Sequence, residues 1–270
     1  MWMSTSDAGL VAATCGPCRV SAKVAAGSAV ELIEETDYPF SDHVRLTVHT
    51  KEPVAFPIYL RIPKWASSAE LTVSGEAARH HPTSGAFFKI DRQWKSGDVV
   101  TLAFNFKVRT ETRKNNAVAI AWGPLYFVLR IGESFKNLSS LTLGPTDTVV
   151  PTPPGCANWQ ITSTTDWNYA LVIDRQNPQC MITTNRISSM PFAQRGELVK
   201  RPGASEFAPW HEDVPIVFHV KARRVPQWGM SGANAAAVPV SPVHVHSLET
   251  LVELIPYGCS RLRIAEFPTV

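Results

Sequence analysis

The first chemistry that the sequence offers is a pair of cysteines, Cys15 and Cys18, separated by Gly16 and Pro17. Two cysteines at this spacing form a redox-active pair when the first stands at the N-terminus of a helix, which lowers the pKa of its thiol. The residues that follow, 19–24, alternate as in a strand. We therefore expect packed thiols near a turn. A thiol or zinc protein built on this pair is the weakest of three functional hypotheses.

Two pairs of histidines could each begin a metal site. His80 and His81 are adjacent and point apart on an extended chain, whereas His244 and His246 would share one face of a strand. A zinc site needs further ligands, and no spaced Cys or acidic partner stands near His244 and His246. We therefore predict solvated histidines in a loop or an edge strand, and no metal site.

The carboxylates Glu34 and Glu35 could serve glycoside hydrolysis, which uses two carboxyl groups that flank one bond. Neighbours in a strand point to opposite faces, so these two cannot flank one bond together. A solvated strand end is the preferred interpretation. The sequence contains no Gly-x-Ser-x-Gly, no His-Glu-x-x-His and no phosphate-binding glycine loop. No catalytic residue is predicted.

Eight tryptophans provide another kind of chemistry. An indole ring is flat and apolar and carries one hydrogen-bond donor, so it can stack on a sugar ring when it is exposed at a turn or strand end. The predicted sugar-binding residues are Trp65, Trp94 and Trp167. This makes a free-standing carbohydrate-binding module for plant-type oligosaccharides the second functional hypothesis. Burial in the core is the alternative for each ring.

The elements that must position these residues are strands. A period of two is typical of an antiparallel sheet with one buried face. Apolar and polar residues alternate in this way over 44–48, 58–62, 100–108 and 216–222, and shorter β-prone runs stand at 30–36, 87–90, 125–131, 169–173 and 262–267. No segment keeps a helical period over a dozen residues. The sequence therefore predicts an all-β fold of antiparallel, jelly-roll-like β-sandwich domains.

Composition narrows the class of protein. The chain has 270 residues, of which 44% are hydrophobic and 18% charged, with a net charge of +3. These values exclude disorder and give no basic footprint for nucleic acid. No apolar run approaches the ~20 residues of a membrane-spanning helix. Residues 1–9 lack the basic and apolar regions of a secretory signal. We expect a soluble chain that binds neither nucleic acid nor a membrane, in a compartment that the sequence does not identify.

Several strings resemble one family in their order and content. They are TDYPF at 36–40, LRIPKWA at 60–66, RQWKSGD at 92–98, WGPL at 122–125, DWNYAL at 166–171, IPYGC at 255–259 and LRI at 262–264. Together they are similar to the C-terminal part of glycoside hydrolase family 127, the β-L-arabinofuranosidase-like proteins. The resemblance covers nearly the whole chain.

The resemblance implies an arrangement of two β-sandwich domains, the second inserted in the first. The first would comprise residues 1–130 with 244–270, and the second residues 131–243. In this family the catalytic unit is an N-terminal (α/α)6 barrel with a zinc site of cysteine and glutamate ligands, one cysteine being the proposed nucleophile. Cys15 and Cys18 do not match the family's adjacent cysteine pair, so no catalytic or metal residue is carried over.

The leading hypothesis is therefore a non-catalytic accessory β-sandwich portion of a family 127-like glycoside hydrolase. The parent activity would be hydrolysis of arabinofuranosides or related glycosides, and the chain alone is expected to be inactive. The expected partner is the catalytic barrel, which would carry the zinc, or a second copy in a homodimer.

Overall fold

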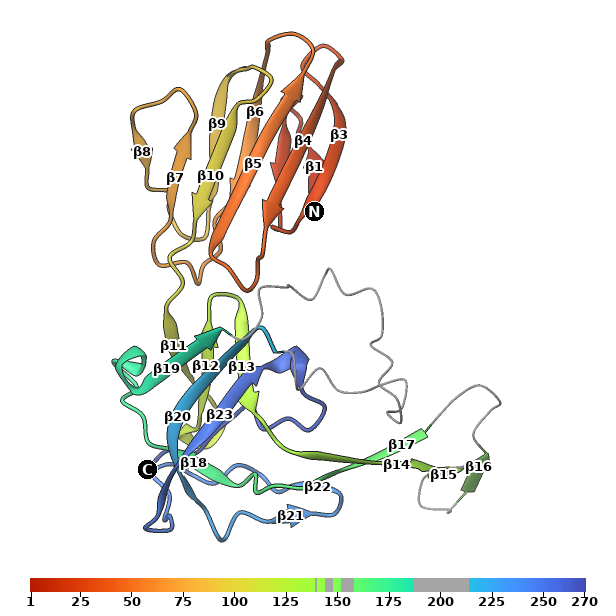
Figure 1. The fold of residues 1–270 in the computed structure, drawn as a ribbon, viewed down its shortest axis with the longest axis vertical. Coiled ribbons are helices and arrows are strands. Elements are labelled where there is room, and N and C mark those ends of the chain that lie inside the picture. Colours follow the sequence, from red (N-terminus) through yellow and green to blue (C-terminus); the bar gives the residue numbers. More distant parts are fainter. Residues whose placement is uncertain (139, 144–147, 152–157, 187–213) are drawn as a thin grey trace. The chain divides into compact units, whose positions relative to one another are not determined.

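The computed structural model describes residues 1–138, 140–143, 148–151, 158–186 and 214–270 (Figure 1). Regular structure in these residues is almost entirely β, and the only helical segments are short 3-10 turns. The predicted all-β fold is confirmed. In the same residues, no helix has the length and apolar character needed to cross a membrane.

The chain forms two compact units, and the first contains residues 1–108 and 122–125. Its strands are β1 (Trp2–Ser4), β2 (Leu10–Ala12), β3 (Cys18–Val24), β4 (Ser28–Thr36), β5 (His43–Thr50), β6 (Val54–Arg61), β7 (Glu70–Val73), β8 (Arg79–His80), β9 (Phe87–Trp94) and β10 (Val99–Ala103). One sheet has the order β1-β2-β6-β9 and the other β3-β4-β5-β10-β7-β8. All neighbours are antiparallel except β2 and β6.

The two sheets of the first unit share one core, which makes this unit a sandwich. Alternation puts Leu32 and Leu46 on the inner face of the larger sheet and Phe56 and Ile58 on the inner face of the smaller one. All four side chains are at most 2% exposed. The sequence pattern of period two thus sets which face of each strand is buried.

The second unit contains residues 109–121 and the described residues from 126 onward. Its strands are β11 (Val108–Thr112), β12 (Val118–Trp122), β13 (Leu125–Leu129), β14 (Glu133–Leu138), β15 (Ser140–Leu143), β16 (Thr148–Pro151), β17 (Asn158–Ser163), β18 (Tyr169–Leu171), β19 (Ile182–Arg186), β20 (Ile216–Arg224), β21 (Met230–Ser231), β22 (Asn234–Ala235) and β23 (Glu249–Pro256). The 3-10 turns are η1 (Lys114–Asn116), η2 (Pro178–Met181) and η5 (Tyr257–Cys259).

A seven-stranded sheet organises the second unit, in the order β11-β12-β13-β23-β20-β18 with β19 also paired to β20. The rings of Phe127 and Phe218 stack in its core, with their centroids 4.0 Å apart. Three two-stranded sheets, β14-β17, β15-β16 and β21-β22, complete the unit (Figure 1).

The division into units differs from the predicted domain boundaries. The first unit ends at Val108 rather than near residue 130, and residues 244–270 lie in the second unit. The physical reason is that β23 pairs with β13 on one side and β20 on the other, which fixes the C-terminal strand in the second sheet.

Two strand predictions also change. The alternating run 100–108 is broken, because Asn105 has a φ of 56° and the amide of Phe104 donates to the carbonyl of Asp42. Asn tolerates this left-handed conformation better than most residues. The run 262–267 forms no strand, although Phe267 makes an isolated bridge with Val118.

Candidate functional site

The candidate site of the first unit centres on Glu34, near the end of β4. Glu34 follows Val30 and Leu32 on the inner face of the strand and is 4% exposed, whereas Glu35 on the other face is exposed. The prediction that both lie at a solvated strand end is therefore wrong for Glu34. Alternation buries this carboxylate because it continues the apolar face of the strand.

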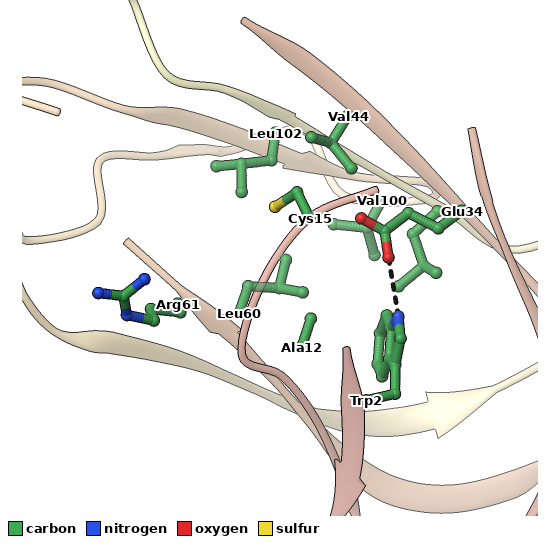
Figure 2. Close-up of a pocket in the computed structure, with 10 residues that line it drawn as sticks. Trp2, Ala12, Cys15, Glu34, Val44, Leu60, Arg61, Val100 and Leu102 are labelled. Atoms are coloured by element: carbon green, nitrogen blue, oxygen red, sulfur yellow. Dashed lines mark hydrogen bonds between the residues drawn. The ribbon is translucent and has the colours of Figure 1, made fainter. Parts of the chain in front are cut away.

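Three donors surround the Glu34 carboxylate. The Trp2 indole N–H donates to Oε2 at 2.8 Å and the Gly16 amide donates to Oε1 at 2.9 Å. The Cys18 thiol lies 3.6 Å from Oε2. Figure 2 shows Glu34 and Trp2 on one side of a small pocket, with Arg61 on the opposite side and Cys15 between them. These contacts satisfy a buried charge that would otherwise be costly.

The two thiols beside Glu34 are held in their protonated form. Burial, with the negative charge of Glu34 as a second cause, raises the pKa of Cys15 to about 12. Burial and the same carboxylate also raise the pKa of Cys18. The thiolate is the nucleophile and the metal ligand, so these cysteines are poorly suited to either task. Both are free, and Cys15 precedes β3 rather than a helix, in agreement with packed thiols near a turn.

A zinc site of the kind that the resemblance implies does not fit this cluster. Within the part of the chain that the structure describes, no group of three or more His, Cys, Asp or Glu side chains could hold a metal ion. The Glu34 carboxylate is already bonded to two N–H groups, and the neighbouring thiols have raised pKa values. His244 and His246 are exposed in a loop, which is one of the two predicted placements.

The structure corrects the prediction of sugar binding for Trp94. Its side chain is fully buried, at 0% exposed, and its indole N–H donates to the carbonyl of Phe56 at 2.8 Å. A ring with no exposed face cannot stack on a sugar. Trp94 therefore fills the core of the sandwich, which was the alternative for each ring.

Trp65 and Trp167 are both partly buried, and each keeps its prediction as a sugar-binding residue. Trp65 lies in the first unit, with its ring centroid 5.5 Å from that of Phe104 and 5.1 Å from that of Phe106, at interplanar angles of 61° and 82°. Trp167 lies in the second unit, 5.3 Å from the ring of Trp228 at 78°. Edge-to-face packing of this kind orients each ring without making a coplanar platform.

Sequence reasoning missed one set of polar residues around Trp167. The buried side chain of Asn168 donates to the carbonyls of Val225 and Trp228, both at 3.0 Å. Its Oδ1 accepts from Nε and Nη2 of Arg224 at 3.2 and 3.0 Å. Arg224 Nη1 also donates to Asp166 at 2.7 Å. The string DWNYAL contains Asp166 and Asn168, but their partners lie more than fifty positions away, in β20 and just after it.

In the residues that the structure describes, the regular structure of the chain is almost entirely β, and its first unit is a sandwich of two sheets in which the buried Glu34 carboxylate accepts hydrogen bonds beside two partly buried thiols. Residues 10–106 match the family model described as beta-L-arabinofuranosidase, GH127 middle domain. The first unit is therefore a GH127 middle-domain-like unit, and the resemblance seen in the sequence is confirmed. No curated protein matches the sequence.

Solved structures extend the likeness to the whole chain. A GH127 beta-L-arabinofuranosidase from Geobacillus stearothermophilus T6 is similar with a TM-score of 0.59 and 20% identity, over 100% of this chain and 35% of that chain. A structure described as a glycoside hydrolase gives 0.59 and 20%, over 98% and 36%. The GH127 beta-arabinofuranosidase BT3674 gives 0.57 and 15%, over 98% and 36%. The chain shares their fold and spans about a third of their length.

Proposed function

We propose that this chain is the non-catalytic, accessory β-sandwich portion of a GH127-like glycoside hydrolase. The complete enzyme would hydrolyse arabinofuranosides or related glycosides. The observation that carries the proposal is the match of residues 10–106 to a middle domain, together with a fold that corresponds to about a third of the length of the two similar GH127 structures. A fold alone does not specify chemistry, so the function also depends on the side chains that the fold presents.

The side chains of the first unit support a structural role. Hydrolysis by two carboxylates requires both to reach one bond, and Glu34 and Glu35 lie on opposite faces of β4. Catalysis by a cysteine requires a thiolate, and the pKa of Cys15 is raised to about 12. In this proposal the reacting groups and the zinc belong to a separate catalytic barrel, and the sandwich supports that barrel. Association of two copies stays a prediction.

The test is product analysis with the purified chain. We would incubate it with β-1,2-linked arabinofuranobiose, α-1,5-linked arabinotriose and xylotriose, with added zinc and a reductant, and separate the sugars by anion-exchange chromatography. We expect no monosaccharide above the buffer control. Release of arabinose that grows in proportion to the amount of chain would contradict the proposal.

A further inference from the structure

Residues 264–270 connect two strands of the seven-stranded sheet that are not neighbours, and we name them the closing segment. Phe267 and Val118 in β12 exchange two backbone hydrogen bonds, of 2.9 and 2.8 Å, as an antiparallel pair. Two residues later, Thr269 forms a parallel bridge with Leu171 in β18. β18 lies at one end of the sheet, and β12 lies next to the strand at the other end. The closing segment therefore links the two sides of the sheet.

Buried groups anchor the closing segment. The side chain of Phe267 is 0% exposed and that of Thr269 is 6% exposed. The Thr269 amide donates to Oγ of Ser241 at 2.9 Å, and the Thr269 hydroxyl accepts from Nη2 of Arg175 at 2.8 Å. The Thr269 carbonyl accepts from the amide of Val243 at 3.1 Å. One buried aromatic ring and one threonine, bonded through its amide, carbonyl and hydroxyl, thus fix the end of the segment.

The closing segment is held less continuously than the sheet that it closes. β20 and β23 pair along a ladder between residues 218–223 and 249–254, whereas the closing segment, among the described residues, forms isolated bridges. Pro268 has no amide hydrogen to donate. Residues 264–266 are only half-buried. A segment with few backbone hydrogen bonds and little buried surface can open locally while a neighbouring ladder stays intact.

We propose that the closing segment is a latch of the second unit, a conformational device that opens and closes the sheet between β12 and β18. In the closed state the Phe267 ring is part of the core. In the open state the ring leaves the core, and the backbone groups of Val118 and Leu171 lose their partners in the segment. Unpaired strand groups pair readily with another extended chain, so the closed latch protects them. The ladder of β20 and β23 stays paired in both states.

Two backbone amides report directly on the latch. The amides of Val118 and Leu171 donate to the carbonyls of Phe267 and Pro268 at 2.8 and 2.9 Å, so they become free to exchange with solvent hydrogen when the segment leaves. We call these two the reporter amides. The amides that pair β20 with β23 are the reference amides, because they belong to the ladder that stays closed.

The experiment is hydrogen exchange of the full chain at increasing urea, read by mass spectrometry of peptic peptides. Local opening exposes little surface and therefore depends weakly on urea, whereas unfolding of the whole unit depends on it strongly. In the parent chain we expect the reporter amides to exchange about tenfold faster than the reference amides, or more, as a locally opening segment does. Their exchange should also depend less on urea.

Two substitutions of the anchoring ring test whether the segment opens separately. Phe267→Ala removes a large buried side chain and should raise the exchange rate of the reporter amides by about a hundredfold. The reference amides should remain protected in the same variant. Phe267→Leu keeps most of the apolar volume and should retain most of the protection. Phe87→Ala, at a ring that is 53% exposed in the first unit, is the matched control and should exchange as the parent does.

Three results would overturn the proposal. The first is that reporter and reference amides of the parent chain exchange at equal rates and with equal dependence on urea, because the segment would then open only with the whole unit. The second is that Phe267→Ala loses the protection of reporter and reference amides together, which includes a variant that does not fold. The third is that the reporter amides of Phe267→Ala stay as protected as those of the parent.

Discussion

The indole N–H of Trp2 donates a 2.8 Å hydrogen bond to the carboxylate of Glu34, and this bond joins the two sheets of the first unit. Trp2 lies in β1 of the smaller sheet and Glu34 in β4 of the larger one. The bond is formed at the border of an apolar pocket, where a polar contact is stronger than in water.

Removing either partner should destabilise the chain. Trp2→Phe keeps a ring but loses the donor, and Glu34→Ala leaves the Trp2 and Gly16 N–H groups without their acceptor. We expect each change to lower the free energy of unfolding by about 1–3 kcal/mol in urea titrations. Glu35→Ala is the control on the exposed face and should stay within about 0.5 kcal/mol. Equal losses for Glu34→Ala and Glu35→Ala would contradict the described role of Glu34.

Stability should fall at alkaline pH because of the partly buried Cys15 thiol. The pKa of Cys15 is raised from an ordinary value of 9.0 to about 12, mainly by burial. The folded state therefore holds this proton more tightly than the unfolded state. Its contribution to stability is complete below about pH 9 and is lost as the pH rises towards 12.

Cys15→Ala should flatten this decline. Between pH 9 and 11 the slope of the unfolding free energy should change by up to about 1.4 kcal/mol per pH unit, the value for one proton. Cys180→Ala, at an exposed cysteine, is the comparison. Chemical denaturation at several pH values gives the slopes, and identical slopes for Cys15→Ala and the parent would refute the assignment.

Trp94 should behave as a core residue. Trp94→Phe removes the donor to the buried carbonyl of Phe56 and should lower stability by about 1–3 kcal/mol, and Trp94→Ala by about 3–5 kcal/mol. Trp65→Phe should cost less, because among the described residues the Trp65 indole N–H has no partner to lose. Thermal unfolding followed by circular dichroism ranks the three variants. A larger loss for Trp65→Phe than for Trp94→Ala would be inconsistent with the structure.

The turn at Gly123 requires glycine. Its φ is 54°, and a Cβ atom there would lie 2.6 Å from two carbons of the Phe106 ring. That ring has little room to move, because it packs edge-to-face on Trp65 and Trp122 at 5.1 and 4.8 Å. Gly123→Ala should lower the unfolding free energy by about 1–3 kcal/mol. Gly97→Ala is the control, because Gly97 has a φ of 91° but open space around it. Its loss of stability measures the cost of a left-handed backbone alone, and the additional loss in Gly123→Ala measures the clash with Phe106.

The sequence predicts the strands well where each has one buried face. The alternation of apolar and polar residues locates β5, β6 and β20, because the buried positions of these strands are occupied by apolar residues. It does not reveal the break at Asn105, since a single left-handed residue changes the backbone without disturbing the pattern.

The burial of individual polar and aromatic residues is harder to predict from the sequence. Glu34 is buried because Trp2 and Gly16 supply donors from 32 and 18 positions away, and Trp94 finds its acceptor 38 positions away. Asn168 and Arg224 meet across 56 positions. Contacts between residues so far apart in the sequence depend on how the strands pair and pack. The spacing of neighbouring residues in the sequence does not predict them.

The most direct measurement of the central claim is the initial rate of hydrolysis of p-nitrophenyl β-L-arabinofuranoside by the purified chain with zinc and a reductant. Enzymes typically turn over about 1–1,000 times per second. We predict a rate equal to that of the buffer control at every concentration of the chain. A rate that rises linearly with the chain and falls when Cys15 or Glu34 is replaced in a folded variant would contradict it.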